Sequence, residues 1–332
     1  MKLAAAAAAL ALLVSFPLAA EPLTQTEVSL SASPIGHFRL GSSQTRFGVL
    51  EFVGGLDLRS PDKEFGQFSA IRFLTPGEDF LGVGDHGFWY FGTILRDANG
   101  VPSGIENFRM QIMLGADGRP LPEKSMADAE GLEVTDGIAT VSFEREARIS
   151  EYKLGPHGAG TPLRDIDIVI PQRELRYNAG IETVLRTDPS GPLEGARIAI
   201  AERSIDTEGN IFAAILEGPQ KGILKVKRTD SFDVTDGAVL PDGDLLLLER
   251  RFSTILGVGV RIRRVASETV KKGALLDGPT LMQADLGYQI DNLEGLDVWQ
   301  RPDGATMISL VSDDNQSFLQ RTLYLEFRLV ED

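Results

Sequence analysis

The chain repeats one short pattern five times, and this repeat constrains its fold more than any other feature. In each copy a small or acidic residue precedes another small residue and an apolar one, and a later apolar strand ends in an acid. The five openings are Ser69-Ala70-Ile71, Glu130-Gly131-Leu132, Glu182-Thr183-Val184, Asp236-Gly237-Ala238 and Glu294-Gly295-Leu296. The closing acids, which recur every 47 to 64 residues, are Asp85, Glu144, Glu202, Glu249 and Asp313. Repeats of this length, built from short strands, are typical of a β-propeller.

The rest of the chain also reads as all-β. Its 35 Gly and 17 Pro bound short strands, and hairpin turns are predicted at Thr135-Asp136-Gly137, Thr207-Glu208-Gly209-Asn210, Pro241-Asp242-Gly243 and Pro302-Asp303-Gly304. The unbroken run Leu245–Leu248 predicts a strand buried on both faces between two blades. We therefore expect a β-propeller with five or six four-stranded blades. Residues 47–58 and 323–330 are strands near the two chain ends, and their pairing in one blade would close the ring.

The first 20 residues have the organisation of a secretory signal peptide. Lys2 is followed by an apolar stretch over residues 3–16 and by Pro17-Leu18-Ala19-Ala20, which predicts cleavage after Ala20. The alternative is a buried alanine-rich helix. We expect a periplasmic or secreted protein in which residues 21–332 form a single propeller domain. With no Cys in the chain, a large apolar core replaces disulfides.

The charge of the chain limits its partners. Lys and Arg number 33 against 48 Asp and Glu, a net charge of −15. A surface of this sign repels nucleic acid and anionic lipid. We expect neither nucleic acid binding nor stable membrane insertion, and the oligomeric state is left open.

Equivalent positions of successive blades converge on one axis, so the repeated acids should gather there. Gathered carboxylates need a counter-charge, and a hard divalent cation, most plausibly Ca²⁺, is one candidate. The densest acidic group, Ser312-Asp313-Asp314-Asn315, is the best metal candidate. The predicted metal ligands are Asp313, Asp314, Glu294, Glu202, Glu182 and Glu130. The alternative is that such acids only accept hydrogen bonds from loop amides.

Arginines that accompany the acids are the second possible counter-charge. In a Glu-Arg dipeptide on a strand the two side chains point to opposite faces, so some of these arginines pair within a blade. The predicted catalytic residues are Glu249, Asp313 and Arg251, and the predicted ligand-binding residues are Arg203, Arg250, Arg321 and His86. For His86 the alternative is an exposed turn residue. The G-x-S-x-G and H-E-x-x-H motifs of other hydrolases are absent from the sequence.

Several segments resemble a known family. They are Asn178–Glu182, Asp233–Gly237, Leu248–Phe252, Asp291–Gly295, Leu310–Asn315 and Gln320–Tyr324. Their order resembles the family called esterase-like activity of phytase, exported propeller-like proteins common in proteobacteria. The resemblance runs from Val53 to Leu329 and implies hydrolysis of phosphate or carboxylic esters. The chain is also similar, in fold only, to calcium-dependent propeller phytases, whose Asp-rich catalytic motif it does not reproduce.

Two functions from different classes follow. The first is a divalent-metal-assisted hydrolase of a small phosphorylated or ester substrate, with the acids holding the metal and the arginines binding the oxyanion. The second is a non-catalytic periplasmic ligand-binding or scaffold propeller, whose acids are structural.

Overall fold

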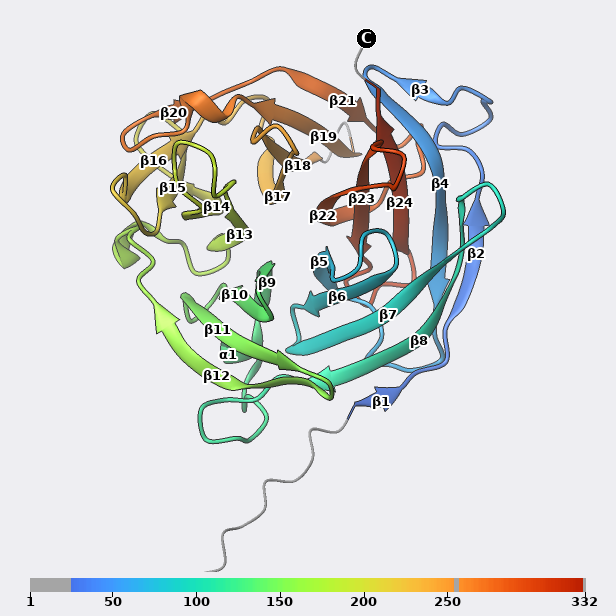
Figure 1. Cartoon of the computed structure of the whole chain (residues 1–332), viewed down its shortest axis with the longest axis horizontal. Helices are drawn as coiled ribbons and strands as arrows, with labels where there is room; N and C mark the ends of the chain where they lie inside the picture. Colours follow the sequence, from blue (N-terminus) through green and yellow to red (C-terminus); the bar gives the residue numbers. More distant parts are fainter. Residues whose placement is uncertain (1–24, 254–256, 331–332) are drawn as a thin grey trace, which may run out of the picture.

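The computed structural model describes residues 25–253 and 257–330, so the predicted signal peptide over residues 1–20 lies outside the described residues. Strands make up nearly all of the regular secondary structure of the described chain and form five sheets arranged around a common centre (Figure 1). One short α-helix, α1 (Lys124–Ala127), and two 3-10 helices, Gln172–Glu174 and Ser267–Thr269, interrupt it. No helix of the described part is long and apolar enough to cross a membrane. The prediction of an all-β propeller is confirmed, with five blades.

Each blade is an antiparallel sheet of four principal strands, which run in order from the centre outward. Blade 1 is β5 (Phe68–Phe73), β6 (Asp79–Gly84), β7 (Phe88–Arg96) and β8 (Pro102–Ile112). Blade 2 is β9 (Ala129–Thr135), β10 (Ile138–Phe143), β11 (Arg148–Gly155) and β12 (Gly158–Ile166). Blade 3 is β13 (Ile181–Arg186), β14 (Arg197–Ile205), β15 (Ile211–Ile215) and β16 (Gly222–Val226).

Blade 4 is β17 (Asp233–Val239), β18 (Leu245–Ser253), β19 (Gly257–Val265) and β21 (Thr280–Ala284). Blade 5 is β22 (Asn292–Gln300), β23 (Thr306–Asp313), β24 (Thr322–Leu329) and β4 (Leu50–Arg59). Short strands extend the outer edges: β1 (Thr26–Glu27) on β8, β20 (Leu275–Leu276) on β16, and both β2 (Ser31–Ile35) and β3 (Arg46–Phe47) on β4.

Blade 5 combines strands from both ends of the chain. β4 pairs antiparallel with β24 over most of its length, from Thr322 opposite Leu58 to Leu329 opposite Leu50. Its inner strand, β22, contacts β5 of blade 1. The first and last blades therefore lie side by side, as Figure 1 shows.

Apolar side chains from adjacent blades form the core. Leu245 and Leu247 belong to a cluster shared with blade 3, whereas Leu246 and Leu248 belong to a cluster shared with blade 5. Successive side chains of a strand point to opposite faces, so this strand is buried on both sides as predicted. Such sheet-on-sheet packing orients each inner strand toward the centre.

Every inner strand carries a β-bulge at the same place, close to its N-terminal end. The register with the second strand shifts at Ser69, Glu130, Glu182, Thr235 and Glu294. A bulge inserts one extra residue and re-aims its side chain relative to a regular ladder. The repeat seen in the sequence is therefore a repeated bulge as well as a repeated strand.

Candidate functional site

When the five blades are aligned at their bulges, the residues that occupy equivalent positions can be identified. On the second strand of each blade, the residue facing the stretch before the bulge is Asp85, Glu144, Glu202, Arg250 or Asp313. Four of these five are acids that the repeat predicted. The fourth blade differs at both positions, because Thr235 replaces the bulge acid and Arg250 replaces the closing acid.

The sequence alignment of blade 4 was wrong by one residue on both of its strands. Asp236 follows the bulge and pairs with Leu248, and Glu249 pairs with Val234. A slip of one residue sends a strand side chain to the opposite face. Glu249 is accordingly fully buried inside the blade, in ion pairs with Arg261 and Arg263. Its predicted catalytic position is corrected, since these cations occupy its carboxylate.

Five carboxylates of blades 2 and 3 meet at the bulged end of the inner strands. Ligand atoms of Asp128, Glu130 and Glu144 all lie within 4.8 Å of one another, and so do those of Glu144, Glu182 and Glu202. Glu130 and Glu182 are the bulge residues of β9 and β13, whereas Glu144 and Glu202 come from the facing strands. We call Asp128, Glu130, Glu144, Glu182 and Glu202 the acid cluster. Asp128, which the repeat did not predict, precedes β9 and accepts the Glu144 N–H on its carbonyl.

Blades 4 and 5 complete the surroundings of the acid cluster. The Arg250 guanidinium lies 3.4 Å from a Glu202 oxygen and 3.3 Å from a Glu294 oxygen. The Asn292 amide donates to Glu294 at 2.8 Å and to Asp313 at 3.1 Å. Glu202 and Glu294 each keep 13% of their side chain exposed, so solvent reaches this end of the axis.

The acid cluster has few neutralising partners. Arg145 pairs with Asp128 at 2.7 Å, and Glu144 accepts a weak bond from the Gly180 N–H at 3.4 Å. Glu182 is only 8% exposed. Within residues 25–253 and 257–330, neither Glu130 nor Glu182 has a hydrogen-bond or ion-pair partner. A buried carboxylate without a partner is costly unless it is protonated or binds a cation.

Burial raises the pKa of these carboxyl groups, and their mutual repulsion adds to the effect. The pKa of Asp128 rises to about 6, that of Glu144 to about 7 and that of Asp313 to about 7. The pKa values of Glu130 and Glu182 lie well above the ordinary value, for the same two reasons. A divalent cation would replace these protons. Several carboxylate oxygens around one point, from buried and half-buried residues, are the ligands that hard cations such as Ca²⁺ prefer, so the residues fit a metal ion.

Asp314, a predicted metal ligand, lies apart from the acid cluster. Its carboxylate accepts the N–H of Gln67 at 3.2 Å and of Gln316 at 3.0 Å, and the hydroxyl of Thr322 at 3.0 Å. These bonds tie the β23–β24 hairpin to blade 1. The sequence alternative of an acid that accepts loop amides describes this residue, and the metal prediction for Asp314 is corrected.

Of the predicted arginines, only Arg250 reaches the acid cluster. Arg251 points to the other face of β18, where its guanidinium lies 4.7 Å from the Phe232 ring, so it does not join the acid cluster and its catalytic role stays a prediction. Arg203 stays at the edge with 48% of its side chain exposed, 3.9 Å from Asp233. Arg321 donates to the Gln289 side chain at 2.8 Å and to the Ile290 carbonyl.

His86 is neither an exposed turn residue nor a member of the acid cluster. Only 12% of its side chain is exposed, and its Nε2 lies 2.9 Å from the Glu64 carbonyl oxygen. The adjacent Asp85 pairs with Lys124 at 3.0 Å. This part of blade 1 is therefore already neutralised.

Sequence reasoning missed Arg72, which crosses the axis between non-adjacent blades. From β5 its guanidinium forms two 2.8 Å bonds to Asp236 on β17 and also donates to the Leu296 carbonyl on β22 at 2.7 Å. Asp236 in turn accepts the Leu296 N–H. The only signal in the sequence is a charged residue within an apolar strand. This pair lies between the acid cluster and a pocket of about 190 Å³ at the opposite ends of the inner strands, which Arg72 also lines.

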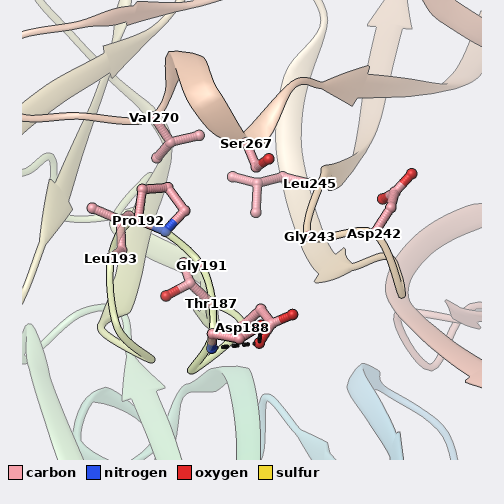
Figure 2. Close-up of a pocket in the computed structure, with 11 residues that line it drawn as sticks. Thr187, Asp188, Gly191, Pro192, Leu193, Asp242, Gly243, Leu245, Ser267 and Val270 are labelled. Carbon is pink, nitrogen blue, oxygen red and sulfur yellow. Dashed lines mark hydrogen bonds between the residues drawn. The ribbon is translucent and has the colours of Figure 1, made fainter.

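A further pocket of about 220 Å³ lies off the axis, between the loop after β13 and the β17–β18 hairpin (Figure 2). It is lined by Asp188 and Asp242 at its edge and by Leu193, Leu245 and Val270 within. Asp188 already accepts the N–H and hydroxyl of Ser190. This pocket shares no residue with the acid cluster.

The family model described as "Esterase-like activity of phytase" matches residues 63–316, which include the inner strands of all five blades. Among curated proteins, none matches the chain. An endo-arabinase from Bacteroides thetaiotaomicron VPI-5482 is 14% identical, covering 86% of this chain and 98% of its own, with a TM-score of 0.49. A PQQ-bound aldose sugar dehydrogenase from Streptomyces coelicolor is 12% identical, covering 86% and 100%, with a TM-score of 0.43.

Proposed function

The chain belongs to the phytase-like family, esterase-like activity of phytase, and from this premise we propose that it is an exported, divalent-metal-assisted hydrolase of phosphoesters or related esters. The observation that carries the proposal is the acid cluster, in which the buried Glu182 has no hydrogen-bond or close ion-pair partner among the described residues and only the more distant charge of Arg250 acts on it. Ca²⁺ is the proposed cation, because it takes six to eight oxygen ligands in flexible geometry.

Three kinds of residue would take part in the hydrolysis. The acid cluster would hold the cation, which when bound polarises the phosphoryl or carbonyl oxygen of the ester. Arg250, which pairs with both Glu202 and Glu294, would bind the developing oxyanion. Asp313, whose pKa burial raises to about 7, would accept the proton of the attacking water near neutral pH.

Export is supported by the pattern of residues 1–20. We propose a periplasmic or secreted protein in which residues 21–332 act as one domain, with a small ester as ligand and no nucleic acid partner. The mass of the exported protein checks cleavage after Ala20. An uncleaved N-terminus would contradict the export proposal.

Calorimetric titration of the chelator-stripped protein with CaCl₂ tests the cation site. We expect binding by the wild type and a loss of at least about tenfold in affinity for Glu182→Gln, because the substitution removes a buried anionic ligand. Glu106→Gln removes an exposed acid of β8 and serves as the matched control, with unchanged affinity expected.

Turnover of p-nitrophenyl phosphate and p-nitrophenyl acetate, with and without calcium, then tests the reaction. Calcium-dependent turnover that falls with the Glu182→Gln affinity supports the hydrolase. Calcium binding without turnover of either ester would favour the ligand-binding propeller instead. Equal turnover in the presence of a chelator would contradict the role of the metal.

A further inference from the structure

The most exposed large apolar side chains of the described chain gather at the end of the axis that holds the acid cluster. Five of them are more than 60% exposed: Tyr177, Phe252, Leu286, Phe318 and Leu319. We call these five residues the apolar rim. All five lie in loops or hairpin ends of blades 3, 4 and 5, on the side of the bulges.

Contacts connect the apolar rim with the residues of the site. The Tyr177 ring lies 6.0 Å from the guanidinium of Arg145, which pairs with Asp128. Phe252 is two residues after Arg250 on β18, so their side chains share one face of that strand. Tyr177 therefore contacts an arginine that pairs with the acid cluster, and Phe252 shares a strand face with another.

The remaining rim residues lie in other loops at the same end of the inner strands. A Cβ added to Gly257 would lie 2.6 Å from the Cδ1 of Leu286, so Leu286 packs closely against this glycine. Gly257 begins β19 and pairs with the last residue of β18. Phe318 and Leu319 belong to the hairpin that begins after Asp313, and Phe318 lines a pocket of about 320 Å³ together with Phe65 and Arg321. Exposed apolar side chains grouped on one face of a protein mark a binding surface, whereas isolated ones do not.

The charges at this end narrow the choice of ligand. Among the described residues, Arg250 and Arg145 are the cations that pair directly with members of the acid cluster, while Lys124, Arg203 and Arg228 act on it without a direct contact. A multiply phosphorylated polyol would place many negative charges among these carboxylates with few cations to receive them. A monoester needs only one polar group at the cation, and its other end can lie on apolar side chains.

We propose that the apolar rim binds the acyl or alkyl part of an amphiphilic monoester while the ester group reaches the acid cluster. The proposal rests on the proposed hydrolase and specifies its substrate class. A buried methylene contributes about 0.8 kcal/mol, roughly a fourfold gain in affinity. On an open rim we expect about half of that free energy, or about twofold per methylene.

Kinetics of the calcium-loaded protein with p-nitrophenyl acetate and p-nitrophenyl butyrate test the proposal. The butyrate-to-acetate ratio of kcat/KM should be about fourfold in the wild type and should fall toward one in Phe252→Ser and in Tyr177→Ser. These residues are exposed, so neither change should unfold the protein. Leu74→Ser, at an exposed apolar residue that follows β5 at the other end, should keep the wild-type ratio.

Equilibrium binding separates this proposal from the hydrolase itself. Calorimetry would compare butylphosphonate with methylphosphonate on the calcium-loaded protein. If butylphosphonate binds more tightly in a way that depends on Phe252, but no ester is turned over, the result would support binding by the apolar rim and contradict the proposed hydrolase activity. Turnover with no dependence on chain length in either assay would overturn the rim and leave the hydrolase standing. A wild type that dimerises through Phe252 in sedimentation velocity would overturn it too, since a second copy would then be the occupant.

Discussion

At the scale of single residues, the contrast between Arg72 and Glu182 shows how the structure uses charge. Both lie in inner strands and both are nearly buried. Arg72 has a bidentate partner in Asp236 and carbonyl acceptors on β22 and β17. Glu182 has no such partner among the described residues. A satisfied buried charge maintains the fold, whereas an unsatisfied one marks a place for a ligand.

Replacement of Arg72 by Met should destabilise the protein strongly. The substitution leaves the fully buried Asp236 without its cation, and removal of one partner of a buried ion pair costs about 3–5 kcal/mol. Urea denaturation would measure the free energy of unfolding. Arg72→Met combined with Asp236→Asn should recover part of the loss, because the uncompensated charge is gone. A single variant within about 0.5 kcal/mol of wild type would show that the pair contributes little.

At the scale of elements, the bulge explains what the sequence could and could not predict. Strand runs and turn residues were sufficient to predict the blades, and the Asp136-Gly137 turn has the positive φ angles, 52° and 73°, that such a hairpin requires. The repeat placed Glu130, Glu182 and Glu294 at the openings of their blades, and the structure shows that each lies at a bulge, which the sequence did not predict. In blade 4, however, acids stand next to the equivalent positions on both strands, and pattern alone could not show that Asp236 and Glu249 are one residue out of register.

The close approach of neighbouring inner strands beside the bulge gives a second prediction. A Cβ at Gly131 would lie 2.6 Å from the Glu182 carbonyl oxygen and 2.8 Å from the Val184 nitrogen. Gly131→Ala should therefore push β13 outward, cost about 1–3 kcal/mol and weaken calcium binding by displacing Glu182. Gly160→Ala, where a Cβ meets nothing within 4 Å, is the control. Thermal denaturation and calcium titration of the two variants should differ; similar values would mean that the strands yield without strain.

At the scale of the whole molecule, the balance between acids and a bound cation sets the response to pH. Burial holds the pKa of Asp128 at about 6 and those of Glu144 and Asp313 at about 7 in the metal-free protein. The native state thus keeps protons that the unfolded chain has released, so the free energy of unfolding falls as pH rises from about 4 to about 7. Calcium binds the charged carboxylates, so its stabilising effect grows over the same range.

We therefore expect calcium to raise the melting temperature more at about pH 8 than at about pH 5.5. With calcium at about 100 times its dissociation constant, the stabilisation is about 2.7 kcal/mol, or about 5 °C for a domain of this size. Differential scanning calorimetry in calcium and in chelator gives both values. Glu182→Gln should show a smaller difference at the higher pH, and a calcium effect that is independent of pH would argue against cation binding by the acid cluster.

The pairing of β4 with β24 also bears on how the molecule is made. Residues from the two ends of the chain must find each other before blade 5 exists, since β4 and β24 lie more than 260 residues apart in the sequence. Contacts of such long separation form late and slowly in folding. Blades 1 to 4 are each built from nearly consecutive strands, so each can fold soon after its strands are synthesised. Glu294 and Asp313 belong to blade 5, which is complete only after β24 has been synthesised. The step that ends folding thus adds the blade 5 side of the site to the acid cluster of blades 2 and 3, and a partly synthesised chain lacks that side.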